Sequence, residues 1–208
     1  MVQIFQGGMK MNFLVFGPRG SGKDTITEIL IDKLDNLQQM RLAKFPLAAC
    51  KAFGIKNPTK ADLVKIGSTI GRNMISKYVW INMALMEMAG SDSDYVISDA
   101  RFHNEYETFL DAGFFPIFIT APIDVCKERV IKRDGFVQEE LFAHESEQNY
   151  HDFVGYRIRN IGTIKDLEEQ VDLLLELTSD EECYNIMLEA FKNLYEVKQH
   201  ERIKQSND

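Results

Sequence analysis

Residues 12–34 read NFLVFGPRGSGKDTITEILIDKL, and this stretch decides the fold. The apolar run from Asn12 to Phe16 has the length and composition of a strand buried on both faces of a parallel sheet. It ends at Gly17, and from Asp24 onward apolar residues recur at three- and four-residue intervals, the spacing of a helix. The segment therefore predicts a strand, a glycine-rich loop and a helix in direct succession.

The loop of this segment, GPRGSGKDT at residues 17–25, fits the phosphate-binding pattern G-x-x-x-x-G-K. Its glycines let backbone N–H groups converge on phosphate oxygens, and the N-terminus of the following helix adds positive partial charge. An ordinary glycine turn has the same letters, but the place between strand and helix favours phosphate binding. The residues expected to bind ATP here are Gly17, Arg19, Gly20, Ser21, Gly22, Lys23, Asp24 and Thr25.

Asp24 stands where this motif usually has a Ser or Thr that ligates magnesium, and Thr25 follows one place later. A carboxylate could hold Mg²⁺ directly or through water, or Thr25 could contact a phosphate. Asp99 ends another apolar run, Tyr95 to Ser98, and functional groups gather beyond the carboxyl ends of parallel strands. We therefore expect Asp24, Thr25 and Asp99 to form the metal site.

Three arginines lie where a phosphate group would need them. Arg101 follows Asp99 by two residues and is expected to hold the phosphate of a second substrate, although a structural Asp–Arg ion pair would look the same. Arg129 and Arg133 are four apart on one face of a predicted helix. They would neutralise the charge of a phosphoryl group in transfer, or else form a solvated basic face.

The composition is that of one α/β domain, or of one domain with a small mobile subdomain. The 208 residues are 45% apolar, and 32 acidic against 24 basic residues give a net charge of −8. Such a charge argues against non-specific binding to duplex nucleic acid. Three scattered cysteines indicate reduced thiols, and no apolar run approaches the roughly 18 residues of a membrane span. We therefore expect a cytoplasmic protein with nucleotide substrates and without nucleic-acid or membrane partners.

Strand and helix patterns alternate along the chain, which predicts a parallel sheet with helices on both faces. The later strands are expected at Met40–Phe45, where Pro46 ends the strand, and at Tyr95–Ser98, Phe115–Thr120 and Tyr156–Arg159. Between Lys60 and Ala89 the pattern is helical but interrupted by Gly67, Gly71 and Gly90. We divide the chain into a domain over residues 1–178, with a helical acceptor subdomain at about 46–92 and a flap at about 134–153, and a C-terminal helical extension over 179–208.

The extension begins with an apparent capping box, Ser179 with Glu182. Its apolar residues at helical spacing are Tyr184, Met187, Leu188, Phe191, Leu194 and Tyr195. This amphipathic helix could pack on its own domain or form a homodimer with a second copy.

In this order the motifs resemble those of the bacteriophage deoxynucleoside monophosphate kinases, a branch of the P-loop nucleoside monophosphate kinases. The resemblance spans most of the chain, from about Asn12 to Leu175, and the loop with Asp after Lys is that family's variant. Residues 96–105, VISDARFHNE, resemble its D-x-R-x-x-N-E stretch. The other similar segments are Gly67-Ser-Thr69 with Arg72 and Trp80, His144-Glu-Ser146-Glu147, and Asn160-Ile-Gly162-Thr163. The chain departs from the family at Ala48, His103 and Ile161, where lysine, proline and aspartate are common.

The resemblance implies a P-loop kinase fold with a five-stranded parallel sheet, and transfer of the γ-phosphoryl of ATP to a (deoxy)nucleoside monophosphate with Mg²⁺. With the loop chemistry, it makes Lys23, Asp99, Arg101, Arg129 and Arg133 the expected catalytic residues. It further implies that Asn160 and Gly162 bind ATP. The residues it implies for the acceptor are Arg72, Trp80, Arg101, Glu105, His144, Ser146 and Glu147.

Two other functions remain open at this point. One is a P-loop kinase for a different small acceptor, such as dephospho-coenzyme A or a phosphorylated alcohol, with Asp24 or Asp99 as the base that a hydroxyl needs. The other is a nucleotide-binding protein without catalysis that docks through its C-terminal helix. His144 and Ser146 also invite a hydrolase interpretation, but no strained G-x-S-x-G elbow accompanies them. Trp80 fits a packed core as well as a nucleobase pocket.

Overall fold

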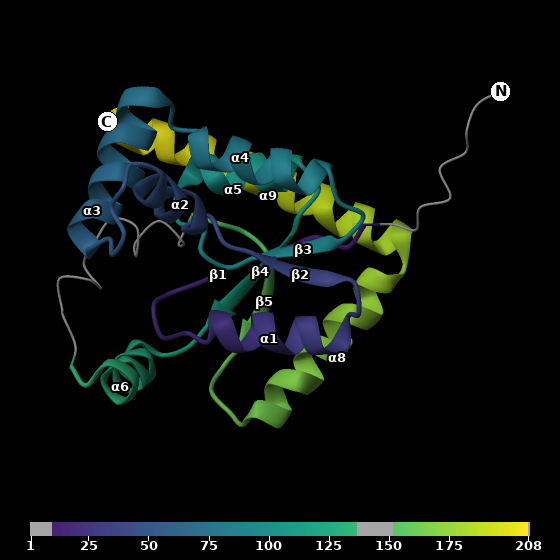
Figure 1. Ribbon diagram of the computed structural model, residues 1–208. Coiled ribbons are helices and arrows are strands. Elements are labelled where there is room, and N and C mark those ends of the chain that lie inside the picture. The colour runs from purple at the N-terminus through teal and green to yellow at the C-terminus, as the bar shows by residue number, and fades with distance from the viewer. Residues whose placement is uncertain (1–9, 137–151, 208) are drawn as a thin grey trace.

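The computed structural model describes residues 10–136 and 152–207. Five parallel strands form one sheet in the order β2-β3-β1-β4-β5 (Figure 1). The strands are β1 (Phe13–Phe16), β2 (Leu37–Met40), β3 (Asp94–Ile97), β4 (Phe115–Thr120) and β5 (Tyr156–Arg159). All four residues of β1 are buried, as its continuous apolar run predicts for a central strand. The predicted five-stranded α/β fold is confirmed.

Helices cover both faces of the sheet. Figure 1 shows α1 (Lys23–Lys33) and α8 (Ile164–Ser179) on one face, and α4 (Val79–Ala89), α5 (His103–Asp111) and α9 (Glu181–Asn207) on the other. The remaining helices lie toward the end of the sheet where the strands finish: α2 (Lys44–Ala52), α3 (Lys60–Val64), the π-helix η1 (Lys65–Ile75) and α6 (Ile123–Asp134). In the residues that the structure describes, no helix combines the length and the apolar composition needed to cross a membrane.

The second strand is shorter and lies earlier than predicted. β2 ends at Met40, whereas the sequence pattern placed a strand over Met40–Phe45. Pro46 lies in the first turn of α2, where a backbone N–H has no partner within the helix and proline is tolerated. The proline therefore marks the start of a helix and not the end of a strand.

Gly67 and Gly71 do not interrupt the helix that contains them, contrary to the prediction, whereas Gly90 directly follows α4 as predicted. Gly67 and Gly71 lie inside η1, which follows α3 directly. At its end the Ser76 N–H donates to the Gly71 carbonyl at 3.0 Å, a bond between residues five apart. Segments of π-helix are rare and occur frequently at functional sites. This one carries Arg72.

The cap of the last helix is Asp180 and not the predicted Ser179. The Asp180 carboxylate accepts a hydrogen bond from the Cys183 N–H at 2.8 Å, which satisfies a free donor of the first turn. The Ser179 hydroxyl instead donates to the Glu176 carbonyl at 2.8 Å, within α8. A carboxylate one residue later takes the capping position because it also favours the positive end of the helix dipole.

The C-terminal helix packs on its own domain. Its apolar side lies against α5, α8 and β4, and Tyr184, Leu188 and Tyr195 are buried there. The Tyr184 hydroxyl donates to the Gly113 carbonyl at 2.7 Å. Leu194, which the sequence pattern places on the same face, is 51% exposed. The apolar side considered for a homodimer is therefore largely occupied within the chain.

Two leucines of this helix test the packing with one type of substitution. We expect Leu188→Ala to lower the free energy of unfolding by about 2–3 kcal/mol, because it leaves a cavity against the domain. Leu194→Ala is the matched control and should change it by about 0.5 kcal/mol or less. Urea denaturation measures both, and equal effects of the two substitutions would contradict the packing.

Candidate active site

The glycine loop turns sharply between β1 and α1. Gly17, Gly20 and Gly22 have φ angles of 146°, 81° and 102°, in the region that side chains disfavour. A Cβ at Gly20 would collide with the backbone of Cys126, and one at Gly22 with the carboxamide of Asn160. Glycine therefore lets the loop pack closely and keeps its N–H groups bare at the N-terminus of α1, an arrangement that fits phosphate.

Asn160 ties this loop to the sheet. Its carboxamide N–H donates to the Ser21 carbonyl at 2.7 Å, and its backbone N–H donates to the Thr120 carbonyl at 2.8 Å. The Asn160 carbonyl and carboxamide oxygens accept from Arg129 at 3.2 and 3.1 Å. Asn160 is buried and shapes the loop from behind, and Gly162 lies in the turn just before α8. Direct contact of these two residues with ATP stays a prediction.

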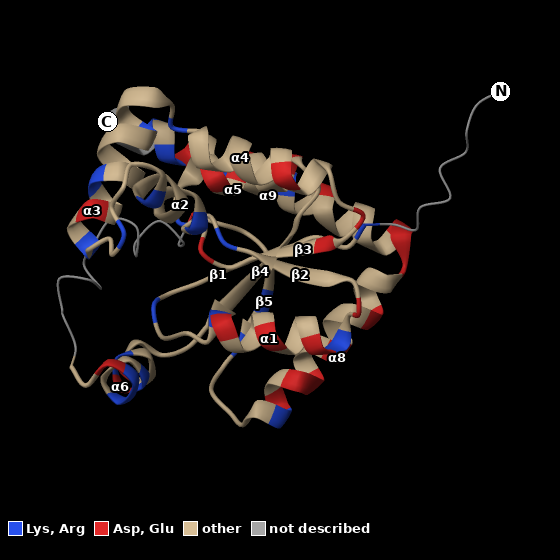
Figure 2. Ribbon diagram, viewed as in Figure 1, with Lys and Arg blue, Asp and Glu red and all other residues tan. Residues whose placement is uncertain are grey.

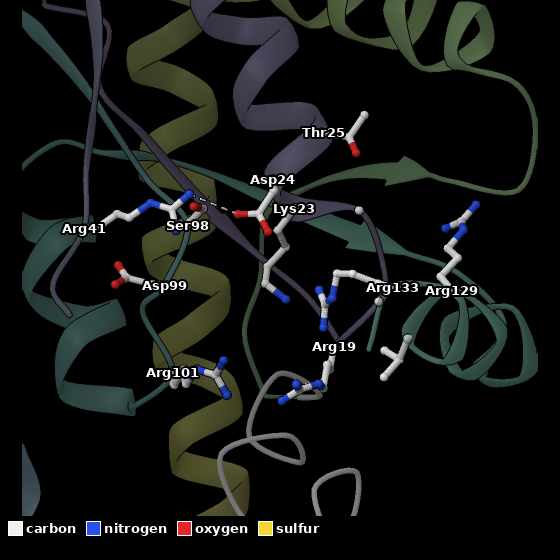
Figure 3. Close-up of a pocket in the computed structure, with 13 residues that line it drawn as sticks. Arg19, Lys23, Asp24, Thr25, Arg41, Ser98, Asp99, Arg101, Arg129 and Arg133 are labelled. Carbon is white, nitrogen blue, oxygen red and sulfur yellow. Dashed lines mark ion pairs between the residues drawn. The ribbon is translucent and has the colours of Figure 1, made fainter. Parts of the chain in front are cut away.

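A cavity of about 420 Å³ opens in front of the loop (Figure 3). Of the described residues, six Lys or Arg and two Asp line it, although the whole chain carries a net charge of −8. The lining residues are Arg19, Gly20, Gly22, Lys23, Asp24, Thr25, Arg41, Ser98, Asp99, Arg101, Arg129, Val130 and Arg133. Figure 2 shows basic residues on α6 and acidic residues along α1. The local excess of positive charge favours an anionic ligand.

Lys23 holds its ammonium group over the loop. Its Nζ donates to the carbonyls of Gly17 and Pro18 at 2.8 and 3.0 Å. In Figure 3, Lys23 and Arg133 point toward the middle of the cavity, whereas Thr25 points away from it. Lys23 therefore lies where its motif predicts, beside the backbone N–H groups that would hold the same phosphates.

The two arginines of α6 have different surroundings. Arg129 points away from the cavity in Figure 3 and binds Asn160, so its guanidinium supports the loop. Arg133 binds the Asp134 carboxylate at 2.7 and 2.9 Å, and Arg19 contacts the same carboxylate at 3.4 Å. The hydrogen bonds from Arg133 lower the pKa of Asp134 to about 2, so this anion persists and holds two arginines that line the cavity. Arg19 and Arg133 thus share one carboxylate, whereas Arg129 contacts Asn160, and the catalytic role predicted for Arg129 and Arg133 stays a prediction.

A second cavity, of about 330 Å³, adjoins the first. It lies among α2, α3, η1 and the loop after β3, and Lys60, Ser68 and Arg72 contribute to its wall. Asp99 and Arg101 line both cavities. The loop after β3 therefore lies between the cavity beside the glycine loop and a second cavity, whose wall adds Lys60 and Arg72.

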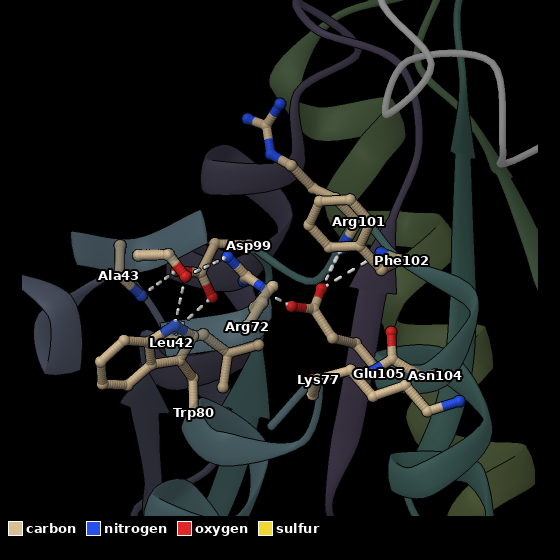
Figure 4. A network of polar contacts seen from close by, with 11 residues as sticks. Leu42, Ala43, Arg72, Lys77, Trp80, Asp99, Arg101, Phe102, Asn104 and Glu105 are labelled. Atoms are coloured by element: carbon tan, nitrogen blue, oxygen red, sulfur yellow. Dashed lines mark hydrogen bonds and ion pairs between the residues drawn. The ribbon is translucent and has the colours of Figure 1, made fainter. Parts of the chain in front are cut away.

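Asp99 has a structural contact as well as a place between the cavities. Its two carboxylate oxygens accept the backbone N–H groups of Leu42 and Ala43 at 3.0 and 2.9 Å (Figure 4). These bonds hold the chain after β2 against the chain after β3. They use one lone pair of each oxygen and leave the others for a metal or water.

The carboxylates suit magnesium only together with a phosphate ligand. Among the described residues, no group of three or more His, Cys, Asp and Glu could hold a metal. Magnesium, however, is usually bound by one or two carboxylates plus substrate phosphates. Asp24 and Asp99 both line the first cavity and fit this pattern, and Asp24 Oδ1 lies 3.6 Å from Arg41 Nη2. Thr25 is less suited, because it points away.

Glu105 is buried and organises the wall of the second cavity (Figure 4). One of its carboxylate oxygens accepts from Arg72 at 2.7 Å, and the other accepts the N–H groups of Arg101 and Phe102 at 2.7 and 3.1 Å. Arg72 also donates to the Gly67 carbonyl at 3.3 Å. Glu105 thus holds the Arg72 side chain and the backbone of Arg101, and its own predicted contact with an acceptor stays a prediction.

The other residues predicted to bind the acceptor divide into two groups. Trp80 is 5% exposed, and in the described part of the chain it lines neither cavity. His144, Ser146 and Glu147 lie outside the described residues, as do residues 137–151 of the flap predicted at about 134–153. Their predicted contacts with substrate stay predictions.

Arg41 and Ser98 line the first cavity and were not among the residues expected there. Arg41 directly follows β2, and Ser98 directly follows β3. A place just beyond the carboxyl end of a parallel strand is the signal that could have found both.

No family model matches the chain, and no curated protein is similar to it. Among solved structures, a shikimate kinase from Bacteroides thetaiotaomicron is 21% identical with a TM-score of 0.56, covering 83% of this chain and 100% of that one. The chain has the fold of the P-loop kinases. TT1252 from Thermus thermophilus is 16% identical with a TM-score of 0.57, and the match covers 80% of this chain and 98% of that one. A gluconokinase from Sinorhizobium meliloti is 16% identical with a TM-score of 0.52, and the match covers 89% of this chain and 96% of that one.

The Glu105 network makes a prediction about stability. In Glu105→Gln the new amide must turn its NH₂ group toward a donor, either Arg72 or the two backbone N–H groups. We expect a loss of about 2 kcal/mol in the free energy of unfolding, the scale of a hydrogen bond to a charged group. Glu87, which pairs with Lys44 at the surface, offers the matched control Glu87→Gln, with a loss of about 0.5 kcal/mol or less. Similar losses in urea denaturation would count against the network.

Proposed function

We propose that this protein transfers the γ-phosphoryl group of ATP to a (deoxy)nucleoside monophosphate. The observation that carries the proposal is the pair of adjoining cavities with Asp99 and Arg101 in both walls. The first contains the phosphate loop and suits the donor, and the second contains Arg72 and suits the acceptor. Donor and acceptor phosphates would then meet beside Asp99 and Arg101, as direct transfer requires.

On the donor side, Lys23 and the loop N–H groups would hold the phosphates of ATP. Mg²⁺, when held by Asp24 and Asp99 and by the phosphates, would neutralise part of their charge. Arg19 and Arg133 line the first cavity, where cations would stabilise the charge that spreads over a phosphoryl group in transfer. Their shared anion Asp134 orients them before the substrate arrives, which lowers the cost of ordering them.

On the acceptor side, Arg72 and Arg101 would bind the phosphate of the nucleotide. An anionic phosphate acceptor needs no general base, so positioning and electrostatics can supply the rate enhancement. The resemblance of residues 67–80 and 96–105 to the acceptor segments of deoxynucleoside monophosphate kinases supports this class of substrate. A guanidinium held by a buried carboxylate, as Arg72 is, offers a fixed donor geometry to the phosphate.

A second candidate function is transfer to a hydroxyl group of a small molecule. Solved structures with the same fold include kinases named for shikimate and gluconate, compounds that carry no phosphate. A hydroxyl acceptor needs a base, and the Asp99 carboxylate lies in the walls of both cavities. The two candidates differ in the acceptor and share the donor site.

A direct assay distinguishes them. ADP release would be measured with ATP and Mg²⁺ against ribo- and deoxynucleoside monophosphates, shikimate, gluconate and dephospho-coenzyme A. We expect turnover with a nucleoside monophosphate, and Lys23→Ala should lower it by about 100-fold or more because a donor to the transferring phosphates is lost. Lys33→Ala, on the same helix but outside the lining of the cavity, is the matched control and should retain the rate.

Other outcomes of this assay would overturn the proposal. Turnover confined to a hydroxyl compound would replace the nucleotide acceptor with the second candidate. ATP binding without turnover on any acceptor would favour a nucleotide-binding protein without catalysis. Equal rates in Lys23→Ala and the unaltered protein would place the reaction outside this loop.

A further inference from the structure

Trp80 is the single tryptophan of the chain and lies beneath η1. Its indole N–H donates to the Gly67 carbonyl at 2.8 Å. The ring lies so close to Gly71 that a Cβ there would collide with it. On the neighbouring helix α2, Pro46 lies where a Cβ at Gly67 would just touch it. The two glycines of the π-helix are therefore the points where other elements hold it.

The Gly67 carbonyl joins Trp80 to Arg72. It accepts the indole N–H and also a guanidinium N–H of Arg72 at 3.3 Å. Arg72 is five residues after Gly67, and bonds between residues five apart define a π-helix. The π-helical spacing brings Arg72 close to the Gly67 carbonyl. Its guanidinium can then donate to this carbonyl and also to the Glu105 carboxylate. A change of register would move Arg72 relative to the second cavity.

We propose that Trp80 is a positioning residue, which holds the π-helical turn from Gly67 to Gly71 and thereby aims Arg72 at the acceptor. This role depends on the proposed function only for the statement that Arg72 binds an acceptor; the contacts of Trp80 with η1 do not depend on it. It explains why a nearly buried tryptophan serves the acceptor site without entering either cavity. Trp80 acts through the Gly67 carbonyl and through the space that Gly71 leaves for its ring.

Kinetics of Trp80→Phe test the proposal. Phenylalanine keeps an aromatic ring but cannot donate to Gly67. We expect the KM for the acceptor to rise about 3- to 10-fold, the equivalent of one net hydrogen bond, while the KM for ATP changes less than about twofold. Leu188→Ala is the control for general destabilisation and should leave both KM values unchanged. Equal rises of both KM values in Trp80→Phe would contradict the proposal.

A double-mutant cycle with Arg72→Ala shows whether Trp80 acts through Arg72. If it does, the double variant and Arg72→Ala alone should differ in acceptor KM by less than about twofold. The reason is that Arg72→Ala has already removed the guanidinium that Trp80 positions. The same fold-change in both backgrounds would show that Trp80 acts independently of Arg72. Gly71→Ala, which displaces the ring from the other side, should reproduce the acceptor-specific rise.

Fluorescence provides a test that needs no substrate, since Trp80 is the only tryptophan. In Gly71→Ala we expect its emission to shift to longer wavelength, because the added Cβ collides with the ring and water reaches the indole. Arg101→Ala changes the second cavity away from the ring and should leave the emission unchanged. An unshifted emission in Gly71→Ala would overturn the role of Trp80 whatever the reaction is. Absence of turnover in the unaltered protein with every acceptor would count against the proposed function alone.

Discussion

Asn160 joins three segments at the carboxyl edge of the sheet, and the geometry of the phosphate loop depends on its hydrogen bonds. It links Ser21 of the loop to the end of β4 and binds Arg129 of α6. Because the carboxamide is buried, its bond to Ser21 forms away from water, where an unpaired polar group would be costly. The same carboxamide fills the space that a Cβ at Gly22 would need, so the loop and its support fit together only with glycine there.

The cations of the two cavities are held in place by anions of the protein. Asp134 binds Arg19 and Arg133, which line the first cavity, and buried Glu105 binds Arg72 in the wall of the second. Side chains oriented in advance lose less conformational entropy when a phosphate binds and need less rearrangement as charge develops. Asp99 extends this organisation to the backbone, because it joins the chain after β2 to the chain after β3. The wall that the two cavities share, which contains Asp99 and Arg101, is thus held in place by hydrogen bonds of the protein itself.

The sequence predicted the fold best at positions where the residue type suits only one kind of local structure. The apolar run of β1 and the glycines of the loop predicted strand, loop and helix correctly, since few other structures suit them. It was less informative for Pro46, which suits a strand end and a first helical turn equally well. The π-helix was missed because i→i+5 bonding has no sequence pattern as distinct as the helical one. For Glu105 and Asn160 the motif indicated importance, but only packing shows that they face inward and position other residues.

Direct transfer requires that donor and acceptor occupy adjoining cavities of one chain, and a bisubstrate ligand tests this most directly. We would measure, by titration calorimetry, the binding of two nucleosides joined through five phosphates, for the unaltered protein and for Arg72→Ala. Occupation of both cavities predicts one ligand per chain, an affinity about 100-fold or more above that of ATP, and loss of most of this gain in Arg72→Ala. Binding no tighter than ATP and unaffected by Arg72→Ala would show that the second cavity is not an acceptor site.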